Sequence, residues 1–281
     1  MRFAFVVSSG LGYRIDSLFQ DEESFGEFKK ALHLLKQHEF DGVELNLSFD
    51  DQHKLDRIKN AIDDSGLKLA AVGTGMLYAQ ERLSFTDRDF DTRTKALSIV
   101  KNLIRFASSE HAVVIIGLVR GSPLPHDRTT DGYLREGLVQ INREAKMNNA
   151  RIALEAINRY ETNLLNTAND VVELIESEKL DATGVLLDTF HMNIEEQSIS
   201  ESIRKNTMRL AHFHIADNDR WPPGHGHLQI GELLRILEDS GYTGWVSAEI
   251  LSKPNNEGAV AGTAKFLKTY KLTNLIFKND V

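Results

Sequence analysis

The chain of 281 residues contains 41 Asp and Glu against 33 Lys and Arg, which gives a formal net charge of −8. This acidic balance argues against an extended, sequence-independent grip on nucleic acid phosphates, because such a surface needs clustered Lys and Arg. The chain has no Cys, which excludes thiolate chemistry, disulfides, Cys-ligated zinc and iron–sulfur clusters, since each needs the sulfur atom.

Short runs rich in β-branched and other apolar residues recur along the chain and predict strands. Several are almost continuously apolar, as expected for parallel strands that are covered on both faces. The eight predicted strands are Phe3–Val7, Gly42–Leu47, Leu67–Gly73, Ala112–Leu118, Arg151–Leu154, Gly184–Leu187, Leu210–Ile215 and Trp245–Ile250.

Longer segments with a helical period lie between these runs. Their clearest apolar stripes are Phe25, Phe28, Leu32 and Leu35; Ala96, Val100, Leu103 and Ile104; Val171, Leu174 and Ile175; and Leu233, Leu234 and Leu237. Strands that alternate with helices indicate parallel βαβ units, and eight such units predict a single (β/α)8 TIM barrel over residues 1–281. A doubly wound open sheet is the alternative, although no G-x-G-x-x-G motif follows the first predicted strand.

The N-terminal sequence, MRFAFVVSSG, has one basic residue and a very short apolar run. This is too little for a secretory signal, and no stretch approaches the roughly 18 apolar residues of a membrane span. We therefore expect a soluble, cytoplasmic protein without a membrane partner.

Ionisable residues lie at the ends of the last four predicted strands. They are Glu155, Asp188, His214 and Glu249. In a parallel barrel the carboxyl ends of the strands share one rim, where active sites form. A single carboxylate in such a place often caps a helix or pairs with Arg, but four ionisable residues in succession are harder to explain in that way.

Three carboxylates at one rim would repel each other unless a cation neutralised them. A divalent metal resolves this conflict. Oxygen ligands with one imidazole suit Mn²⁺, Co²⁺ or Mg²⁺ better than a structural zinc, although the ligand types alone do not exclude Zn²⁺. The sequence therefore predicts one divalent ion, with Mn²⁺ as the first choice.

Further polar residues follow these strand ends in loops that overhang a barrel mouth. Glu161, His191 and Arg220 are predicted to contact the substrate, while Glu161 or Arg220 alone would more often be a solvated charge. Arg120 follows the fourth predicted strand and suits a carboxylate or phosphate, with a structural salt bridge as the alternative. His225 and His227 lie in one loop, where histidines without a third nearby ligand usually form hydrogen bonds.

The segments EAINRYE, LLDTFHMN, HFHIADNDRWPPGHGH and VSAEI resemble the metal-binding strands of the D-tagatose 3-epimerase family, in the xylose-isomerase-like group of TIM-barrel sugar isomerases and epimerases. The resemblance is specific from about Arg151 to Ile250 and only architectural before that. It implies a homo-oligomer, either a dimer or a tetramer. It also implies site residues, namely metal ligands at Glu155, Asp188, His214 and Glu249, an acid/base pair at Glu155 and Glu249, and substrate contacts at Glu161, His191 and Arg220.

The chemistry of these groups agrees with that resemblance. A metal polarises a ketone and the neighbouring hydroxyl, and two carboxylates then remove and return a proton on opposite faces of one carbon through a cis-enediolate. We expect a metal-dependent epimerase, an isomerase of carbohydrate metabolism, that inverts the carbon beside the ketone of a ketose or keto-acid sugar.

Other functions stay open at this point. An aldose–ketose isomerase or a sugar dehydratase would use the same scaffold, and a sugar-binding barrel without activity is a third reading. An endonuclease-IV-like DNA repair enzyme is a distant alternative, because it needs further His ligands at earlier strand ends and a more basic face. The expected partner is a small sugar or sugar acid and not a nucleic acid.

Overall fold

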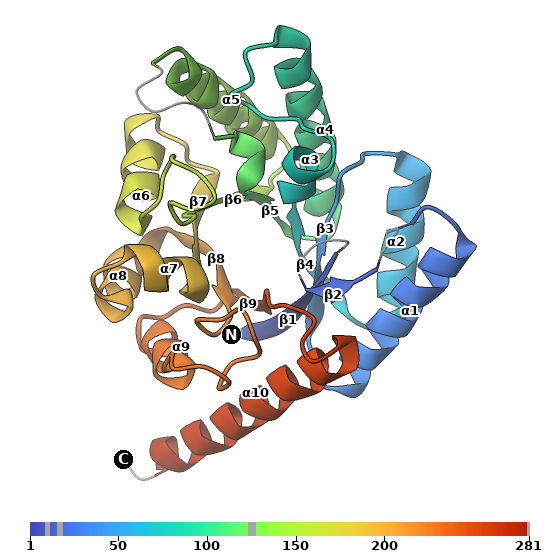
Figure 1. Cartoon of the computed structure of the whole chain (residues 1–281), viewed down its shortest axis with the longest axis vertical. Coiled ribbons are helices and arrows are strands. Elements are labelled where there is room, and N and C mark those ends of the chain that lie inside the picture. The colour runs from blue at the N-terminus through green and yellow to red at the C-terminus, as the bar shows by residue number, and fades with distance from the viewer. Residues whose placement is uncertain (9–11, 16–18, 123–127, 280–281) are drawn as a thin grey trace.

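Parallel strands close into a barrel in the computed structural model of the chain, and helices surround it (Figure 1). The structure describes residues 1–8, 12–15, 19–122 and 128–279. The barrel strands are β1 (Arg2–Ser8), β3 (Gly42–Asn46), β4 (Lys68–Gly73), β5 (Val113–Ile116), β6 (Arg151–Glu155), β7 (Thr183–Asp188), β8 (Leu210–Ile215) and β9 (Trp245–Ala248).

Each barrel strand pairs in parallel with the next one along the chain, and β9 pairs with β1. Arg2 lies opposite Trp245 in this closing pair. A two-residue strand, β2 (Tyr13–Arg14), pairs in parallel with the carboxyl end of β1, where Val7 lies opposite Tyr13. The closing pair confirms the predicted TIM barrel and contradicts the open doubly wound sheet.

The helices of the described chain cover the outside of the barrel (Figure 1). They are α1 (Glu22–Gln37), α2 (Gln52–Ser65), α3 (Gly75–Ala79), α4 (Phe90–Ser109), α5 (Arg128–Met147), α6 (Ala168–Ser177), α7 (Thr189–Glu195), α8 (Ile199–Asn206), α9 (Ile230–Asp239) and α10 (Asn256–Asn279). Several of these helices begin at a side-chain cap, in which a carboxylate or hydroxyl oxygen accepts a hydrogen bond from an otherwise unpaired backbone N–H. Asp21 accepts from the Ser24 amide in this way, at 2.8 Å. Within the described residues, no helix has both the length and the apolar character needed to cross a bilayer.

The alternation of side chains along each strand separates two cores. Val114 and Ile116 of β5 pack in the large core under the helices, whereas Val113 and Ile115 belong to a small cluster with residues such as Leu186. Successive strand residues point to opposite faces, so the small cluster fills the inside of the barrel. Buried polar groups, including Glu155 and His214, occupy the barrel at the carboxyl ends of the strands.

One predicted strand end was wrong. The fourth predicted strand, Ala112–Leu118, ends at Ile116, because the backbone leaves the extended conformation at Gly117 and forms a 3₁₀ turn over Leu118–Arg120. The long connection Gly75–Asp91 contains the short helix α3. In the other long connection, Gly121–Thr130, residues 123–127 lie outside the described residues.

Candidate active site

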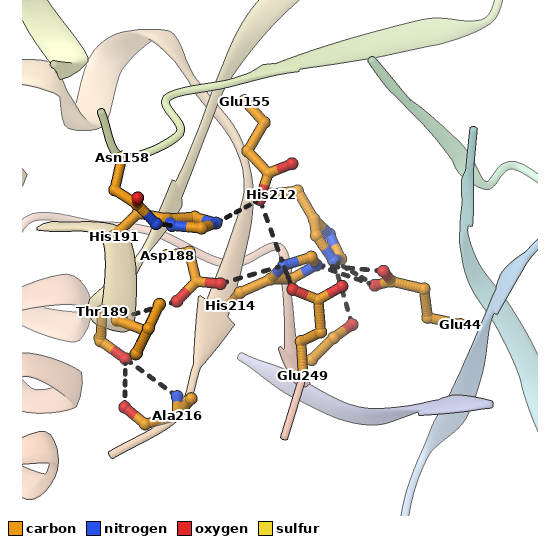
Figure 2. A network of polar contacts seen from close by, with 12 residues as sticks. Glu44, Glu155, Asn158, Asp188, Thr189, His191, His212, His214, Ala216 and Glu249 are labelled. Atoms are coloured by element: carbon orange, nitrogen blue, oxygen red, sulfur yellow. Dashed lines mark hydrogen bonds and ion pairs between the residues drawn. The ribbon is translucent and has the colours of Figure 1, made fainter. Parts of the chain in front are cut away.

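Four ionisable side chains converge at the carboxyl ends of the last four barrel strands. Glu155 and Asp188 end β6 and β7, His214 lies on β8, and Glu249 directly follows β9. One ligand atom from each lies within 4.8 Å of the others. Figure 2 shows these four side chains pointing toward one another inside the barrel. The structure therefore brings together the residues predicted to bind a metal.

The distances between these groups leave room for a cation. His214 Nδ1 lies 3.5 Å from Glu249 Oε2, 3.8 Å from Asp188 Oδ2 and 4.0 Å from Glu155 Oε1. This nitrogen is buried and has no hydrogen-bond partner. An orphaned buried ring nitrogen that faces three carboxylates fits a divalent ion, since imidazole and carboxylate oxygen are its common ligands.

The two glutamates of this cluster differ in their electrostatic environment. Burial and the nearby Glu249 carboxylate raise the pKa of Glu155 to about 8. Burial would also raise the pKa of Glu249, but the nearby His214 and Arg220 hold that pKa well below its usual range. At neutral pH and without a cation, Glu155 thus retains a proton while Glu249 is ionised. Such a difference is typical of acid/base pairs.

The three loop residues predicted as substrate contacts lie beside the cluster. Arg220 Nη1 donates to Glu249 Oε2 at 2.9 Å and to Asp188 Oδ2 at 3.1 Å. Arg220 Nη2 lies 3.1 Å from His191 Nε2. His191 Nδ1 in turn lies 3.9 Å from Glu161 Oε1. Arg220, His191 and Glu161 thus form a continuous polar wall.

This wall lines a cavity of about 240 Å³ together with apolar and small residues. Its polar lining residues are Glu44, Asn46, Thr74, Glu155, Glu161, His191, His214, Arg220 and Glu249, and its other lining residues are Gly73, Gly75, Met76, Ala79, Ile115, Gly117, Leu118 and Ile157. The lining therefore combines charged groups with apolar and small residues. This combination is typical of sites that hold a small ligand by a few placed polar groups.

A sequence model of the xylose isomerase-like TIM barrel family matches residues 32–270. The chain belongs to this family. A D-psicose 3-epimerase from Ruminiclostridium cellulolyticum is 30% identical over 243 residues, which are 82% of this chain and 80% of the relative. A D-psicose 3-epimerase from Enterocloster bolteae is 26% identical over 255 residues, 87% of this chain and 83% of the relative.

A solved D-allulose 3-epimerase from Methylomonas sp. superimposes with a TM-score of 0.79 at 19% identity, covering 96% of this chain and 98% of the other. This likeness supports the fold. The sequence relatives carry the assignment of class, and they confirm the expected resemblance and the expected enzyme class, a sugar epimerase among the isomerases.

Arg120 lies elsewhere in this family member than the sequence suggests. Its side chain is fully buried, and Nη1 donates to the backbone carbonyl of Glu155, while Nε and Nη2 have no hydrogen-bond partner. Arg120 is not among the residues that line the cavity. The end of β5 at Ile116 explains this position, because the 3₁₀ turn carries Arg120 beside the end of β6. Its contact with a substrate anion stays a prediction.

Asp217 was missed from the sequence although it organises the loop that carries Arg220. Its buried carboxylate accepts from the amides of Asn218, Gly224 and Leu228 at 2.9, 2.9 and 3.1 Å. Three charge-assisted bonds from one carboxylate fix the path of this loop. The signal available in the sequence was an acid two residues after a strand end.

Two aromatic rings in the same loop stack on each other. The ring of Trp221 lies 4.1 Å from that of His225, and His225 Nδ1 lies 2.8 Å from Asp219 Oδ2. Among the described residues, neither His225 nor His227 belongs to a group that could hold a metal.

Glu44 is the other residue that the sequence reading missed. It lies within β3, in the sequence GVELN, and is almost completely buried. Burial would raise its pKa, but His214 and His212 lower the pKa of Glu44 to about 2. An acid in the middle of a predicted strand was the available signal, but its partners lie on β8, far away along the chain.

Proposed function

We propose that this protein is a metal-dependent ketose 3-epimerase, which inverts the carbon beside the ketone of its substrate. The observation that carries the proposal is the pair of glutamates, Glu155 and Glu249, which line one cavity and differ in their affinity for a proton. Inversion needs two such groups, because a proton leaves one face of the carbon and another returns to the opposite face.

The metal ligands in this proposal are Glu155, Asp188, His214 and Glu249. Their oxygen-rich set with one imidazole, and the orphaned Nδ1 of His214, suit Mn²⁺, with Co²⁺, Mg²⁺ and then Zn²⁺ as further candidates. When bound, the ion supplies positive charge that polarises the ketone and the neighbouring hydroxyl and acidifies the C–H between them.

The chain's own residues then move the proton. In one direction, ionised Glu249 would remove the C–H proton and give a cis-enediolate, and Glu155, which takes up a proton from solvent after losing its own when the ion binds, would return that proton to the opposite face. In the reverse direction the two glutamates exchange roles. Arg220 and His191 hold the reacting oxygens, while Glu161 positions the neighbouring hydroxyl, so the substrate stays aligned between the two carboxylates.

Within this proposal a neutral ketose is preferred to a keto-acid sugar. Arg220 is the one Arg or Lys among the described residues that lines the cavity, and Asp188 and Glu249 already pair with it. A substrate carboxylate would therefore lack a free cationic partner unless Arg120 turned toward it. D-psicose, named in the relatives, is the first substrate to test.

The same groups would also serve an aldose–ketose isomerase or a sugar dehydratase with a differently seated substrate. The endonuclease-like alternative has less support, because both candidate metal groups of the described residues share His214 and the net charge is −8. We further propose a cytoplasmic dimer or tetramer whose partner is a small sugar and not a nucleic acid.

Turnover in deuterated water tests the reaction type. The protein is loaded with Mn²⁺ and incubated with D-psicose, and products are analysed by NMR and mass spectrometry. An epimerase yields D-fructose with deuterium at C3. Deuterium at a carbon of an aldose product would instead indicate an isomerase, and loss of water a dehydratase. No turnover of any ketose would overturn the proposal.

A further inference from the structure

A buried carboxylate from the opposite side of the barrel contacts the other nitrogen of His214. His214 Nε2 lies 3.1 Å from Glu44 Oε1 and 3.2 Å from Glu44 Oε2. Glu44 belongs to β3 and His214 to β8, and both side chains are almost completely buried. Figure 2 shows Glu44 reaching toward His214 from the side of the barrel away from Asp188.

The two nitrogens of His214 therefore have different surroundings. Nε2 faces Glu44, while Nδ1 faces Glu155, Asp188 and Glu249 and lacks a hydrogen-bond partner. An ionised carboxylate is only an acceptor, so the nitrogen that faces it must carry the hydrogen. In a neutral imidazole the lone pair then lies on Nδ1, which is the form a metal binds.

A second histidine holds Glu44 in place. His212 Nε2 lies 2.8 Å from Glu44 Oε2 and 3.0 Å from Ser247 Oγ. His212 and Ser247 are both fully buried. Glu44, which comes from β3, is thus held by two histidines of β8, and His212 is in turn held by Ser247 of β9.

We propose that Glu44 is a positioning residue for the metal centre: it accepts the Nε2–H of His214 and so presents the Nδ1 lone pair of His214 to the ion. This inference rests on the proposed metal dependence. It assigns Glu44 no contact with the metal or with the substrate. Outer carboxylates of this kind orient a ligating histidine and make it a stronger ligand.

Glu44, His212 and His214 also satisfy the simple distance criterion for a metal group of their own. Glu44 Oε2 already lies 2.8 Å from His212 Nε2 and 3.2 Å from His214 Nε2. Hydrogens on the two Nε2 atoms fill these contacts, and an ion between them would have to displace both. The stoichiometry of metal binding separates this alternative from the positioning role.

The test compares Mn²⁺ binding by metal-free wild type, Glu44→Gln and Val43→Ala, using calorimetry and the electron paramagnetic resonance signal of free Mn²⁺. Gln can donate to Nε2 as well as accept from it, so it no longer selects one tautomer. We expect one ion per chain in wild type, and a dissociation constant about ten- to hundredfold higher in Glu44→Gln. Val43 precedes Glu44 and packs in the large core under the helices. Val43→Ala is therefore expected to lower Tm, because it leaves a cavity in that core. Its Mn²⁺ affinity should stay within about twofold of wild type.

A spectroscopic readout follows the tautomer itself. Long-range ¹H–¹⁵N spectra of metal-free ¹⁵N-histidine protein, at a pH where His214 is neutral, should show His214 with hydrogen on Nε2 alone in wild type and Val43→Ala. A second His214 form is expected in Glu44→Gln.

Several results would overturn the proposal. One is a Glu44→Gln variant that binds Mn²⁺ as tightly as wild type and shows a single His214 form. Another is the binding of two ions per wild-type chain. If Glu44→Gln does not fold, Glu44→Asp decides, since its shorter carboxylate should still weaken binding, and unchanged affinity would contradict the role. Absence of Mn²⁺ binding in wild type would instead remove the proposed metal dependence, and this inference with it.

Discussion

At the scale of single residues, the environment of Glu155 and Glu249 decides what each carboxylate does. His214 and Arg220 stabilise the ionised form of Glu249, whereas burial and the charge of Glu249 favour a proton on Glu155. Two identical side chains therefore differ in protonation state in the metal-free protein. This difference depends on their partners and not on residue type.

Replacing either glutamate with Gln should abolish proton transfer at its face of the substrate. We expect Glu155→Gln and Glu249→Gln each to lower turnover of D-psicose by about 10²–10⁴-fold, the usual contribution of an acid/base group, with loss of deuterium incorporation at C3. Glu173→Gln, an exposed carboxylate on α6, is the matched control and should behave as wild type. Undiminished exchange in either site variant would contradict the two-base scheme.

Metal binding should weaken as the pH falls. The pKa of Glu155 is about 8 in the metal-free protein because of burial and the Glu249 charge, and a carboxylate must lose its proton to bind a metal. Binding therefore releases a proton below pH 8, and the dissociation constant should rise about tenfold for each pH unit between 8 and 6. Calorimetry in buffers of different ionisation enthalpy measures both the affinity and the released proton. Affinity that is flat from pH 6 to 8 would contradict the raised pKa.

At the scale of elements, the sequence predicts the strands and helices and the residues that lie at strand ends. Glu155 and Asp188 were identified because each ends a strand, and parallel strands bring their carboxyl ends to one rim. The convergence of these positions was foreseen, while their chemical roles stay proposals.

Other features depend on tertiary contacts that periodicity does not contain. Glu44 was missed because it lies mid-strand and its partner His214 is 170 residues away. Arg120 was expected at the mouth because the run Ala112–Leu118 stays apolar beyond Ile116, where the strand in fact ends. Local apolar character continues through a change of backbone conformation, so it does not locate a strand end.

Gly117, between β5 and the following 3₁₀ turn, leaves space for the Glu155 carboxylate because it has no side chain. A Cβ at Gly117 would lie 2.7 Å from Glu155 Oε2, too close for normal contact. We expect Gly117→Ala to displace the Glu155 carboxylate and lower kcat by about tenfold to a hundredfold, since small misplacements of reacting groups are costly. Steady-state kinetics and Tm together measure this effect. Gly26→Ala, on α1 with open space around it, is the control and should raise Tm slightly and leave kcat unchanged. A wild-type kcat in Gly117→Ala would show that the Glu155 carboxylate does not need the space left by Gly117.

At the scale of the whole molecule, closure of the barrel is what brings distant residues together. Pairing of β9 with β1 makes a ring, so side chains of β3 and β8, which β9 and β1 separate along the wall, can contact each other across its interior. The acidic charge of −8 has a related local meaning, because Glu155, Asp188 and Glu249 concentrate negative charge in one buried place. A bound cation would neutralise this cluster, and the whole barrel should gain stability from it.

Metal binding should therefore raise the thermal stability of the entire chain. Four strands, β6 to β9, contribute the proposed ligands, and an unfolded chain cannot hold them together, so binding favours the folded state by mass action. At free Mn²⁺ about a hundredfold above its dissociation constant, the gain is about 2.7 kcal/mol, or roughly 5–10 °C in Tm for a chain of this size. Differential scanning calorimetry with Mn²⁺ and then with excess EDTA measures the shift and its reversal. Glu249→Gln lacks one proposed ligand and should show a much smaller shift, whereas an equal shift in that variant would place the ion elsewhere in the molecule.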